Sequence, residues 1–406
     1  MYASHSRQRP GRVYDCPAVT AHPSELSAAS LMEHAVQQVG SDDWGDPGFA
    51  AALDLLLASC RERDALTPFG RRVLRSAALR HLRNRLMVQA FVRANPGIEQ
   101  RPLHAAIVIT GLPRTGTTVL QHLLALDPDN RYLVLWEALR PVPPQDAAAR
   151  AALIEQARAW LEQFYELVPG FRAIHALTPE GPEECDALLQ NSFASQHFDD
   201  MFDAPAYSHW LRHANLADEY SYYALQLRML ASADPVPRAW LLKSPLHVAH
   251  LDALLQVLDG ALVVHCHRQP LAAVTSYASL IATLRSTYDE DVSLRAVGRQ
   301  ALERSATAMT RALAIRESAG SDAFVDVSLD EIVRDPIGVV REIYRRAGRA
   351  TTAPFEACMR QWIADNPVGR HGAHRPVVAD FGLTEKAVAA AFAPYTERFA
   401  ELVGAA

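Results

Sequence analysis

The chain has 406 residues, 49% of them hydrophobic and 21% charged, so it can bury a sizeable core and does not resemble a disordered protein. The formal net charge of −6 argues against a general nucleic-acid-binding protein, which would carry an excess of lysine and arginine. The five cysteines include no C-x-x-C pair, the start is polar, and no run approaches the roughly 20 apolar residues of a membrane span, so we expect a reduced, cytoplasmic protein.

The N-terminal section has a helical pattern. Residues 1–22 show no hydrophobic periodicity, and we interpret them as a loose arm. From Ser24 to about Asn95, apolar residues recur at helical spacing in three stretches, the third of which begins at Thr67-Pro68, a capping residue followed by a proline suited to the first turn. We therefore predict a helical N-terminal extension over residues 1–100, followed by an α/β domain over residues 101–406.

Short apolar runs then alternate with helical patterns. The runs cover residues 105–110, 240–243, 261–266 and 323–327. Short apolar runs of this kind, rich in valine, isoleucine or leucine, predict buried parallel strands. The helical patterns cover 119–126, 248–258, 271–284 and 336–347, and most of the chain after Thr352. This alternation predicts an α/β fold with a P-loop-like core, in which helices flank both faces of a central parallel sheet.

The segment Gly111–Thr118 (GLPRTGTT) follows the first of these strands and opens a helix. Glycines let successive N–H groups point at one anion, and the helix N-terminus adds partial positive charge. Thr117 stands where the P-loop pattern G-x-x-x-x-G-K-S/T has the lysine that reaches the β- and γ-phosphates of a triphosphate, and Arg114 supplies a cation earlier in the loop. A single phosphate is therefore the expected ligand, although an ordinary strand-to-helix turn fits the short pattern equally well.

A second cationic segment, His267-Arg268-Gln269-Pro270, leaves the strand at 261–266, and Ser276 follows in the next helix. Ligands of open α/β sheets gather at the carboxyl ends of the strands, which makes Arg268 a candidate anion ligand. Ser276 stands about two turns beyond Pro270 and needs a ligand alongside the helix, or a bend. The spacing also allows Arg268 to pair with a carboxylate and Ser276 to be a solvated helix residue.

Together these segments resemble the sulfotransferases that use 3′-phosphoadenosine 5′-phosphosulfate (PAPS). The 5′-phosphate loop of that family, P-K/R-S/T-G-T-S/T, matches Pro113–Thr118, and its 3′-phosphate motif, an arginine followed eight residues later by a serine, matches Arg268 and Ser276. Weaker matches to the long bacterial branch are Pro182–Glu184 (PEE) and Lys243–His247 (KSPLH). The resemblance covers about residues 105–383.

The resemblance implies PAPS as co-substrate, a small hydroxyl acceptor, and no metal. It assigns the donor nucleotide to Arg114, Thr115, Gly116, Thr117, Thr118, Arg268 and Ser276. In relatives a basic loop also covers the 3′-phosphate, and this role is carried over to Arg370 and His374, although the R-K-G-x-x-G wording of the cytosolic enzymes is absent here. Neighbouring His371 and His374 lack a third ligand at sensible spacing, so we expect no metal there.

Catalytic roles follow from the same resemblance. Arg114 would neutralise charge on the bridging oxygen as the sulfonate leaves, although arginine, unlike the lysine usual in the cytosolic enzymes, does not readily donate a proton. Lys243 would contact the leaving phosphate or the sulfonate. A base must take the proton of the acceptor hydroxyl. His247 is the first candidate, since a histidine follows a strand-end lysine in relatives, here with a register that differs by two residues; Glu184 is its rival. His247 as a cap of the helix at 248–258 is an equal alternative.

The acceptor site is expected among helices at about 145–235. Aromatic residues are frequent there and favour an apolar alcohol or phenol over a sugar, although such residues are often core: Phe193, Phe198, Phe202, Tyr207, Trp210, Tyr220, Tyr222 and Tyr223. Two other functions stay open, a P-loop nucleotide kinase or NTPase and a non-catalytic nucleotide-binding relative. The helical extension also allows an oligomer.

Overall fold

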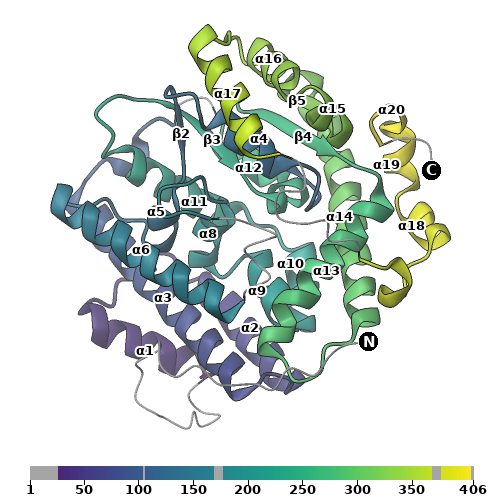
Figure 1. Cartoon of the computed structure of the whole chain (residues 1–406). Helices are drawn as coiled ribbons and strands as arrows, with labels where there is room; N and C mark the ends of the chain where they lie inside the picture. The colour runs from purple at the N-terminus through teal and green to yellow at the C-terminus, as the bar shows by residue number, and fades with distance from the viewer. Residues whose placement is uncertain (1–25, 104–105, 169–176, 368–375, 404–406) are drawn as a thin grey trace.

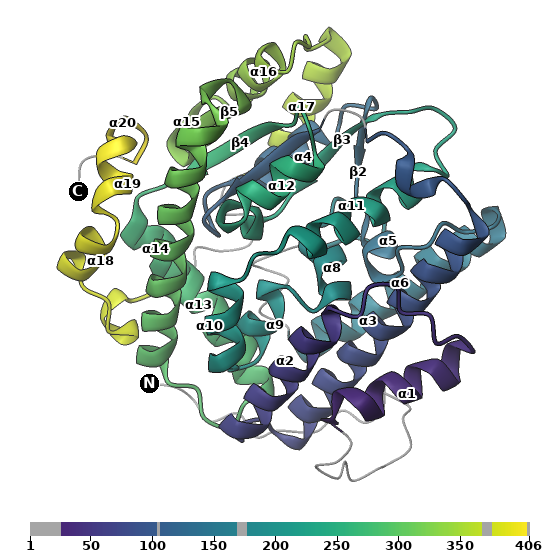
Figure 2. The same ribbon diagram turned by 180° about the vertical axis from the view of Figure 1, so that it is seen from behind.

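The computed structural model describes residues 26–103, 106–168, 177–367 and 376–403. The arm expected at residues 1–22 lies outside these ranges. The N-terminal helices lie at one end of the molecule, α15 to α17 lie at the other, and the sheet lies between them (Figures 1 and 2). None of the helices in the described ranges is long and apolar enough to cross a bilayer.

Five parallel strands form one sheet in the order β2-β3-β1-β4-β5. They are β1 (Ile107–Gly111), β2 (Asn130–Tyr132), β3 (Ala239–Lys243), β4 (Leu262–His267) and β5 (Phe324–Ser328). Four of them confirm the predicted runs to within two residues at each end. Because β3, β1 and β4 are neighbours, the segments that follow these three strands leave the same edge of the sheet side by side.

Strand β2 was not predicted. Its sequence is Asn-Arg-Tyr, which has no apolar run, and it lies at the edge of the sheet beside β3. Its Arg131 is buried and pairs with Glu137 and with Asp234, the latter at 3.0 Å between Nε and Oδ2. Ion pairs with nearby Glu137 and with distant Asp234 therefore help to hold this strand, and a local apolar pattern cannot reveal them.

Alternate residues of the strands face two separate hydrophobic cores, which confirms a sheet covered on both faces. Val108 and Val263 pack into the larger core, whereas Ile109 and Val264 pack into the smaller one. The smaller core also takes side chains from α4, α15, α16 and α17, and the larger one takes side chains from α1 to α3, α8 to α14, α18 and α19. The sheet thus separates the α15–α17 end from the N-terminal end.

Two helices begin at the capping residues that the sequence predicts. Thr67 accepts a hydrogen bond from Gly70 N at 2.9 Å, and Asp335 accepts one from Gly338 N at 2.9 Å, each before a proline in the first turn. The helices are α1 (Ala28–Val39), α2 (Phe49–Arg63), α3 (Pro68–Ala94), α4 (Thr117–Leu124), α5 (Leu135–Leu139), α6 (Ala147–Leu167), α8 (Asp186–Leu189), α9 (Gln196–Met201), α10 (Pro205–His213), α11 (Ala217–Ala231), α12 (Leu251–Val257), α13 (Pro270–Tyr288), α14 (Leu294–Ala319), α15 (Leu329–Arg334), α16 (Pro336–Arg346), α17 (Ala353–Asp365), α18 (Glu385–Ala391), α19 (Ala393–Arg398) and α20 (Ala400–Val403).

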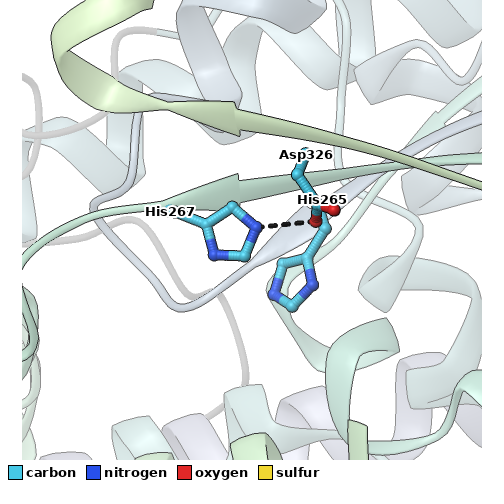
Figure 3. Close-up of side chains that lie close together, drawn as sticks. All are labelled: His265, His267 and Asp326. Carbon is cyan, nitrogen blue, oxygen red and sulfur yellow. Dashed lines mark hydrogen bonds and ion pairs between the residues drawn. The ribbon is translucent and has the colours of Figure 1, made fainter. Parts of the chain in front are cut away.

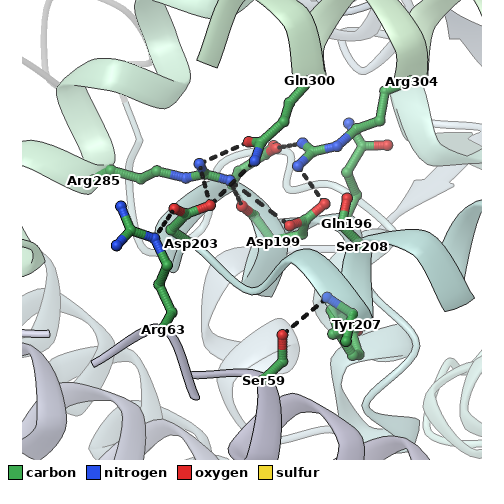
Figure 4. Close-up of polar contacts among 12 residues, drawn as sticks. Ser59, Arg63, Gln196, Asp199, Asp203, Tyr207, Ser208, Arg285, Gln300 and Arg304 are labelled. Carbon is green, nitrogen blue, oxygen red and sulfur yellow. Dashed lines mark hydrogen bonds and ion pairs between the residues drawn. The ribbon is translucent and has the colours of Figure 1, made fainter. Parts of the chain in front are cut away.

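A buried network of ion pairs joins the N-terminal helices to α13 and α14 (Figure 4). Arg285 Nη1 lies 2.9 Å from Asp203 Oδ1, and Arg63 Nε lies 2.8 Å from Asp203 Oδ2. Arg304 pairs with Asp199, and both side chains are almost fully buried. The network connects the end of α2 to the helix that carries Ser276, so the N-terminal section is fastened to the α/β half of the chain.

Candidate active site

The loop between β1 and α4 needs glycine at both of its ends. Gly111 has a φ of 141°, and a Cβ there would lie 2.4 Å from the carbonyl oxygen of Cys266 on β4. Gly116 has a φ of 90°, and its Cβ would lie 2.9 Å from Leu329 Cδ1. A side chain at either position would push the loop away from its neighbours, so the glycines keep the backbone tight at the start of α4.

The two motifs that the sequence suggests for anion binding contact each other. Arg268 Nη1 donates to the carbonyl oxygen of Arg114 at 2.9 Å, and Arg114 Nε donates to Ser276 Oγ at 3.3 Å. Burial, followed by repulsion from Arg268, lowers the pKa of Arg114. Two guanidinium groups side by side create a strongly positive site, which a phosphate would neutralise.

Thr115, Thr117 and Thr118 differ in what their side chains offer. Thr115 Oγ1 is buried and donates to the carbonyl oxygen of Leu112 at 2.8 Å, so this hydroxyl closes the loop on itself. Thr117 and Thr118 line the adjoining cavity at the first turn of α4. Hydroxyl groups at a helix N-terminus are suited to bind an anion.

Lys243, at the end of β3, reaches the same loop. Its Nζ lies 3.4 Å from Thr118 Oγ1 and forms an ion pair with Glu184. Cys185 N donates to the carbonyl oxygen of Lys243 at 2.9 Å, which fixes the Glu184 backbone beside the end of β3. The lysine is buried, while about a quarter (26%) of the Glu184 side chain is exposed, so the carboxylate faces the cavity.

Two further carboxyl groups beside Glu184 were not predicted as site residues. Burial raises the pKa of Glu183 and of Asp186 to about 7. Ser195 Oγ donates to Asp186 Oδ2 at 2.6 Å, and the amide of Gln121 donates to the carbonyl oxygen of Glu183 at 3.0 Å. Three acidic residues within four positions of the sequence were the available signal, but their burial follows from tertiary packing.

His247 lies apart from this group. It is fully buried in a short 3₁₀ helix, η4 (Pro245–Ala249), and its Nδ1 is hydrogen bonded to Tyr220 Oη at 2.8 Å. Burial lowers its pKa to about 3. It is not among the side chains that line the cavity, although Lys243 and Leu246 are. It also does not cap the next helix, which starts at Leu251 with His250 in the N-cap position.

A cavity of about 1000 Å³ extends from the loop toward the N-terminal helices. Its end at the loop between β1 and α4 is lined by Arg114, Thr117, Thr118, Lys243 and Arg268. Its far wall comes from α3 and α6, where the rings of Trp160 and Phe164 stack with centroids 5.4 Å apart. This size matches the larger small-molecule sites of proteins.

Among the aromatic residues expected around an acceptor, Phe198 and Phe202 line the cavity. Others, such as Tyr207 and Tyr223, are fully buried in the larger core. The sequence did not predict that α3 forms a wall of the cavity. The apolar pattern of a helix predicts the face that packs on the core, but not what lies against its other face. The residues Arg370 and His374, expected over the 3′-phosphate, lie outside the described residues.

A separate cluster joins β4 and β5 through His265, His267 and Asp326 (Figure 3), and Arg316 of α14 contacts it. His267 Nε2 lies 2.8 Å from Asp326 Oδ1, and its Nδ1 lies 2.9 Å from Tyr395 Oη. Arg316 lies 3.0 Å from His265 Nδ1 and 2.7 Å from Asp326 Oδ2. His265, His267 and Asp326 are close enough to hold a metal ion, but the Arg316 guanidinium already occupies the acidic side of the cluster. The arrangement is better suited to fix the end of β4.

Comparisons with known proteins agree with this geometry. A model of the sulfotransferase family matches residues 106–353. The solved structure of sulfotransferase STF9 from Mycobacterium avium is similar, with 29% identity and a TM-score of 0.81 over 95% of this chain and 98% of the other. Sulfotransferase STF1 from Mycobacterium tuberculosis H37Rv is similar at 28% identity and a TM-score of 0.80 over 90% of this chain and 98% of the other. A search of curated protein sequences found no match.

Proposed function

Because this chain belongs to the sulfotransferase family, we propose that it transfers a sulfonate group from PAPS to a hydroxyl group of a small acceptor. The family supports the transferase class. The donor rests on one observation above all: Arg268 and Ser276 contact Arg114, so the two anion-binding motifs meet at one edge of the sheet. A nucleotide with separate 5′ and 3′ anions is suited to such a double site.

The residues around the loop fit this donor. The loop N–H groups and the hydroxyls of Thr117 and Thr118 would bind the 5′-phosphate, while Arg268 and Ser276 would bind the 3′-phosphate. Lys243 approaches Thr118 from the neighbouring strand and supplies a cation that the loop itself lacks at Thr117. Lys243 pairs with Glu184 and lies near Thr118. In that position the lysine is suited to bind a sulfonate attached to the 5′-phosphate.

The proposed reaction is a single displacement at sulfur. The acceptor oxygen bonds to the sulfur, the bond from sulfur to the bridging oxygen breaks, and adenosine 3′,5′-bisphosphate leaves. Arg114 and Lys243 stabilise the negative charge that develops on the bridging oxygen, because fixed positive groups in a partly dry site need no reorganisation. The hydroxyl proton passes to a carboxylate.

We assign the role of the base to the carboxylate of Glu184 and not to His247. Glu184 lines the cavity beside Lys243, whereas His247 is fully buried, bonded to Tyr220 and absent from the cavity wall. A general base needs hydrogen-bond reach to the proton that it removes. Because Glu184 lines the cavity, an acceptor bound there could come within that reach. The positive charge of Lys243 favours the ionised form of the carboxylate, which is the form that accepts a proton.

Calorimetry tests the donor. The proposal predicts that adenosine 3′,5′-bisphosphate binds in the micromolar range without magnesium, while ATP binds weakly with or without it. Tight, magnesium-dependent binding of ATP without binding of the bisphosphate would support a kinase or NTPase and refute the proposal. Binding of the bisphosphate without sulfonate transfer from labelled PAPS to any acceptor in a broad panel would favour a non-catalytic relative.

A further inference from the structure

The cavity contains arginines beyond those that we assign to the donor. Arg75, Arg80 and Arg83 of α3 line it in addition to Arg114 and Arg268, the two arginines that we assign to the donor. All three α3 arginines come from the N-terminal section, whereas Arg114 and Arg268 come from the α/β half of the chain. This second group of cations needs its own explanation.

Two of these arginines have no carboxylate partner in the part of the chain that the structure describes. Arg75 Nη2 lies 3.3 Å from His34 Nδ1, and the buried Arg75 Nε has no hydrogen-bond partner among the described residues. Arg83 forms no hydrogen bond or ion pair with another described residue, and it is exposed. Arg75 is half-buried, so it is a partly desolvated cation without a carboxylate partner among the described residues. Such a cation is costly, and a bound anion would remove that cost.

The acidic groups of the same cavity are engaged elsewhere. Glu184 pairs with Lys243, and Asp200 Oδ1 lies 2.6 Å from Arg304 Nη1 on the opposite side. Asp186 accepts from Ser195, and burial holds the pKa of both Asp186 and Glu183 near 7, so a substantial fraction of each is neutral at physiological pH. The described carboxyl groups of the cavity therefore do not cancel the charge of α3.

The cavity also has an apolar surface. The stacked rings of Trp160 and Phe164 form its α6 side, and the Arg80 guanidinium carbon lies 5.8 Å from the centre of the Trp160 ring. This surface therefore adjoins the arginines of α3, while Glu184 lines the same cavity beside Lys243 at the end of β3.

From this shared lining we infer that the acceptor is an anionic amphiphile, with a hydroxyl at Glu184, an apolar body against Trp160 and Phe164, and a carboxylate or similar anion at Arg75 and Arg83. The inference rests on the proposed function, since it takes the Glu184 end as the place of transfer. It narrows the acceptor from apolar alcohols in general to hydroxy acids and their phosphate or sulfate analogues.

A matched pair of ligands tests it. The full chain is first titrated with adenosine 3′,5′-bisphosphate and then, at saturation, with 10-hydroxydecanoate or with 1,10-decanediol, which keeps the chain and hydroxyl but has no charge. We expect the acid to bind about tenfold more tightly than the diol, the size expected of one charge-assisted hydrogen bond. In the double variant Arg75→Gln/Arg83→Gln this preference should disappear, with the affinity for the diol unchanged.

Arg72→Gln is the control, because Arg72 is an exposed arginine of the same helix that does not line the cavity, and it should keep the preference. Equal affinities for the acid and the diol in the unmodified chain, or a preference that survives in the double variant, would overturn the inference and leave the proposed donor intact. If the bisphosphate itself does not bind, the proposed function fails, and the inference fails with it. Retained bisphosphate affinity in the double variant shows that the variant is folded.

Discussion

Among single residues, Arg114 adopts a backbone conformation that side chains other than glycine rarely take. Its φ is 72°, and such conformations cost about 1–3 kcal/mol. The conformation directs its side chain to Ser276 and its carbonyl oxygen to Arg268. In this conformation Arg114 connects the β1–α4 loop to the Arg268 segment. Lys243 adds a third cation from a different strand, and Glu184 holds that lysine.

Glu184→Gln tests the assignment of the base at this scale. Because an amide cannot take the hydroxyl proton, we expect turnover to fall by about 10²–10⁴-fold, the usual contribution of general base catalysis. Affinity for adenosine 3′,5′-bisphosphate, measured by calorimetry, should change little. Steady-state kinetics with labelled PAPS gives the turnover.

His247→Asn is the matched comparison for Glu184→Gln. Burial lowers the pKa of His247 to about 3, so the ring is neutral from pH 5 to 8 and cannot produce a titration of activity in that range. We expect this variant to lose stability with turnover largely retained. A large loss of turnover in His247→Asn, together with a small one in Glu184→Gln, would show that the histidine is the base.

At the scale of elements, α13 joins the site to the rest of the fold. It begins at Pro270, just after Arg268, carries Ser276, and ends near Arg285 in the buried ion-pair network. The cluster around His267 fixes the strand before it, and Tyr395 of α19 contacts His267. Burial raises the pKa of Tyr395, and a hydrogen bond to the Arg268 backbone opposes that rise, so α19 also contacts the Arg268 segment.

Removal of one partner from the ion-pair network should lower the free energy of unfolding. Arg285→Met leaves the carboxylates of Asp203 and Asp199 without one of their cations, and breaking a buried pair in this way costs about 3–5 kcal/mol. Urea unfolding followed by circular dichroism measures the loss. Arg158→Met, which removes an exposed pair with Glu155 on α6, is the control and should be close to neutral. Equal effects of the two substitutions would show that the network contributes no more than a surface pair.

Much of this architecture could be predicted from the sequence. Apolar runs revealed β1, β3, β4 and β5, and cap-and-proline pairs such as Thr67-Pro68 revealed helix starts, because these signals are local. The sequence also predicted that Arg114 and Arg268 lie at strand ends. It did not reveal strand β2, the buried position of His247, or the arginines of α3 in the cavity wall. Each of those depends on contacts between distant segments, which leave no periodic pattern in the chain.

At the scale of the whole molecule, the sheet edge and the N-terminal helices share one cavity. Thr117, Lys243 and Arg268 line it from the α/β half, and Arg75 and Arg83 line it from α3. The helices α1 to α3 also pack into the same large core as α9 to α14. The N-terminal section therefore contributes directly to the site, and a chain cut near residue 100 would lose one wall of the cavity. The predicted boundary near that residue stays a prediction.

The central claim is that the two motifs bind the two phosphates of one nucleotide. The most direct measurement compares, by calorimetry without magnesium, the affinities of adenosine 3′,5′-bisphosphate and adenosine 5′-phosphate for the unmodified chain and for Arg268→Ala. We predict that the bisphosphate binds more tightly than the monophosphate by about 1.5–3 kcal/mol, the contribution of hydrogen bonds to a charged group, and that Arg268→Ala removes this difference without weakening the monophosphate. Equal binding of both nucleotides by the unmodified chain, or an equal loss for both in the variant, would contradict it.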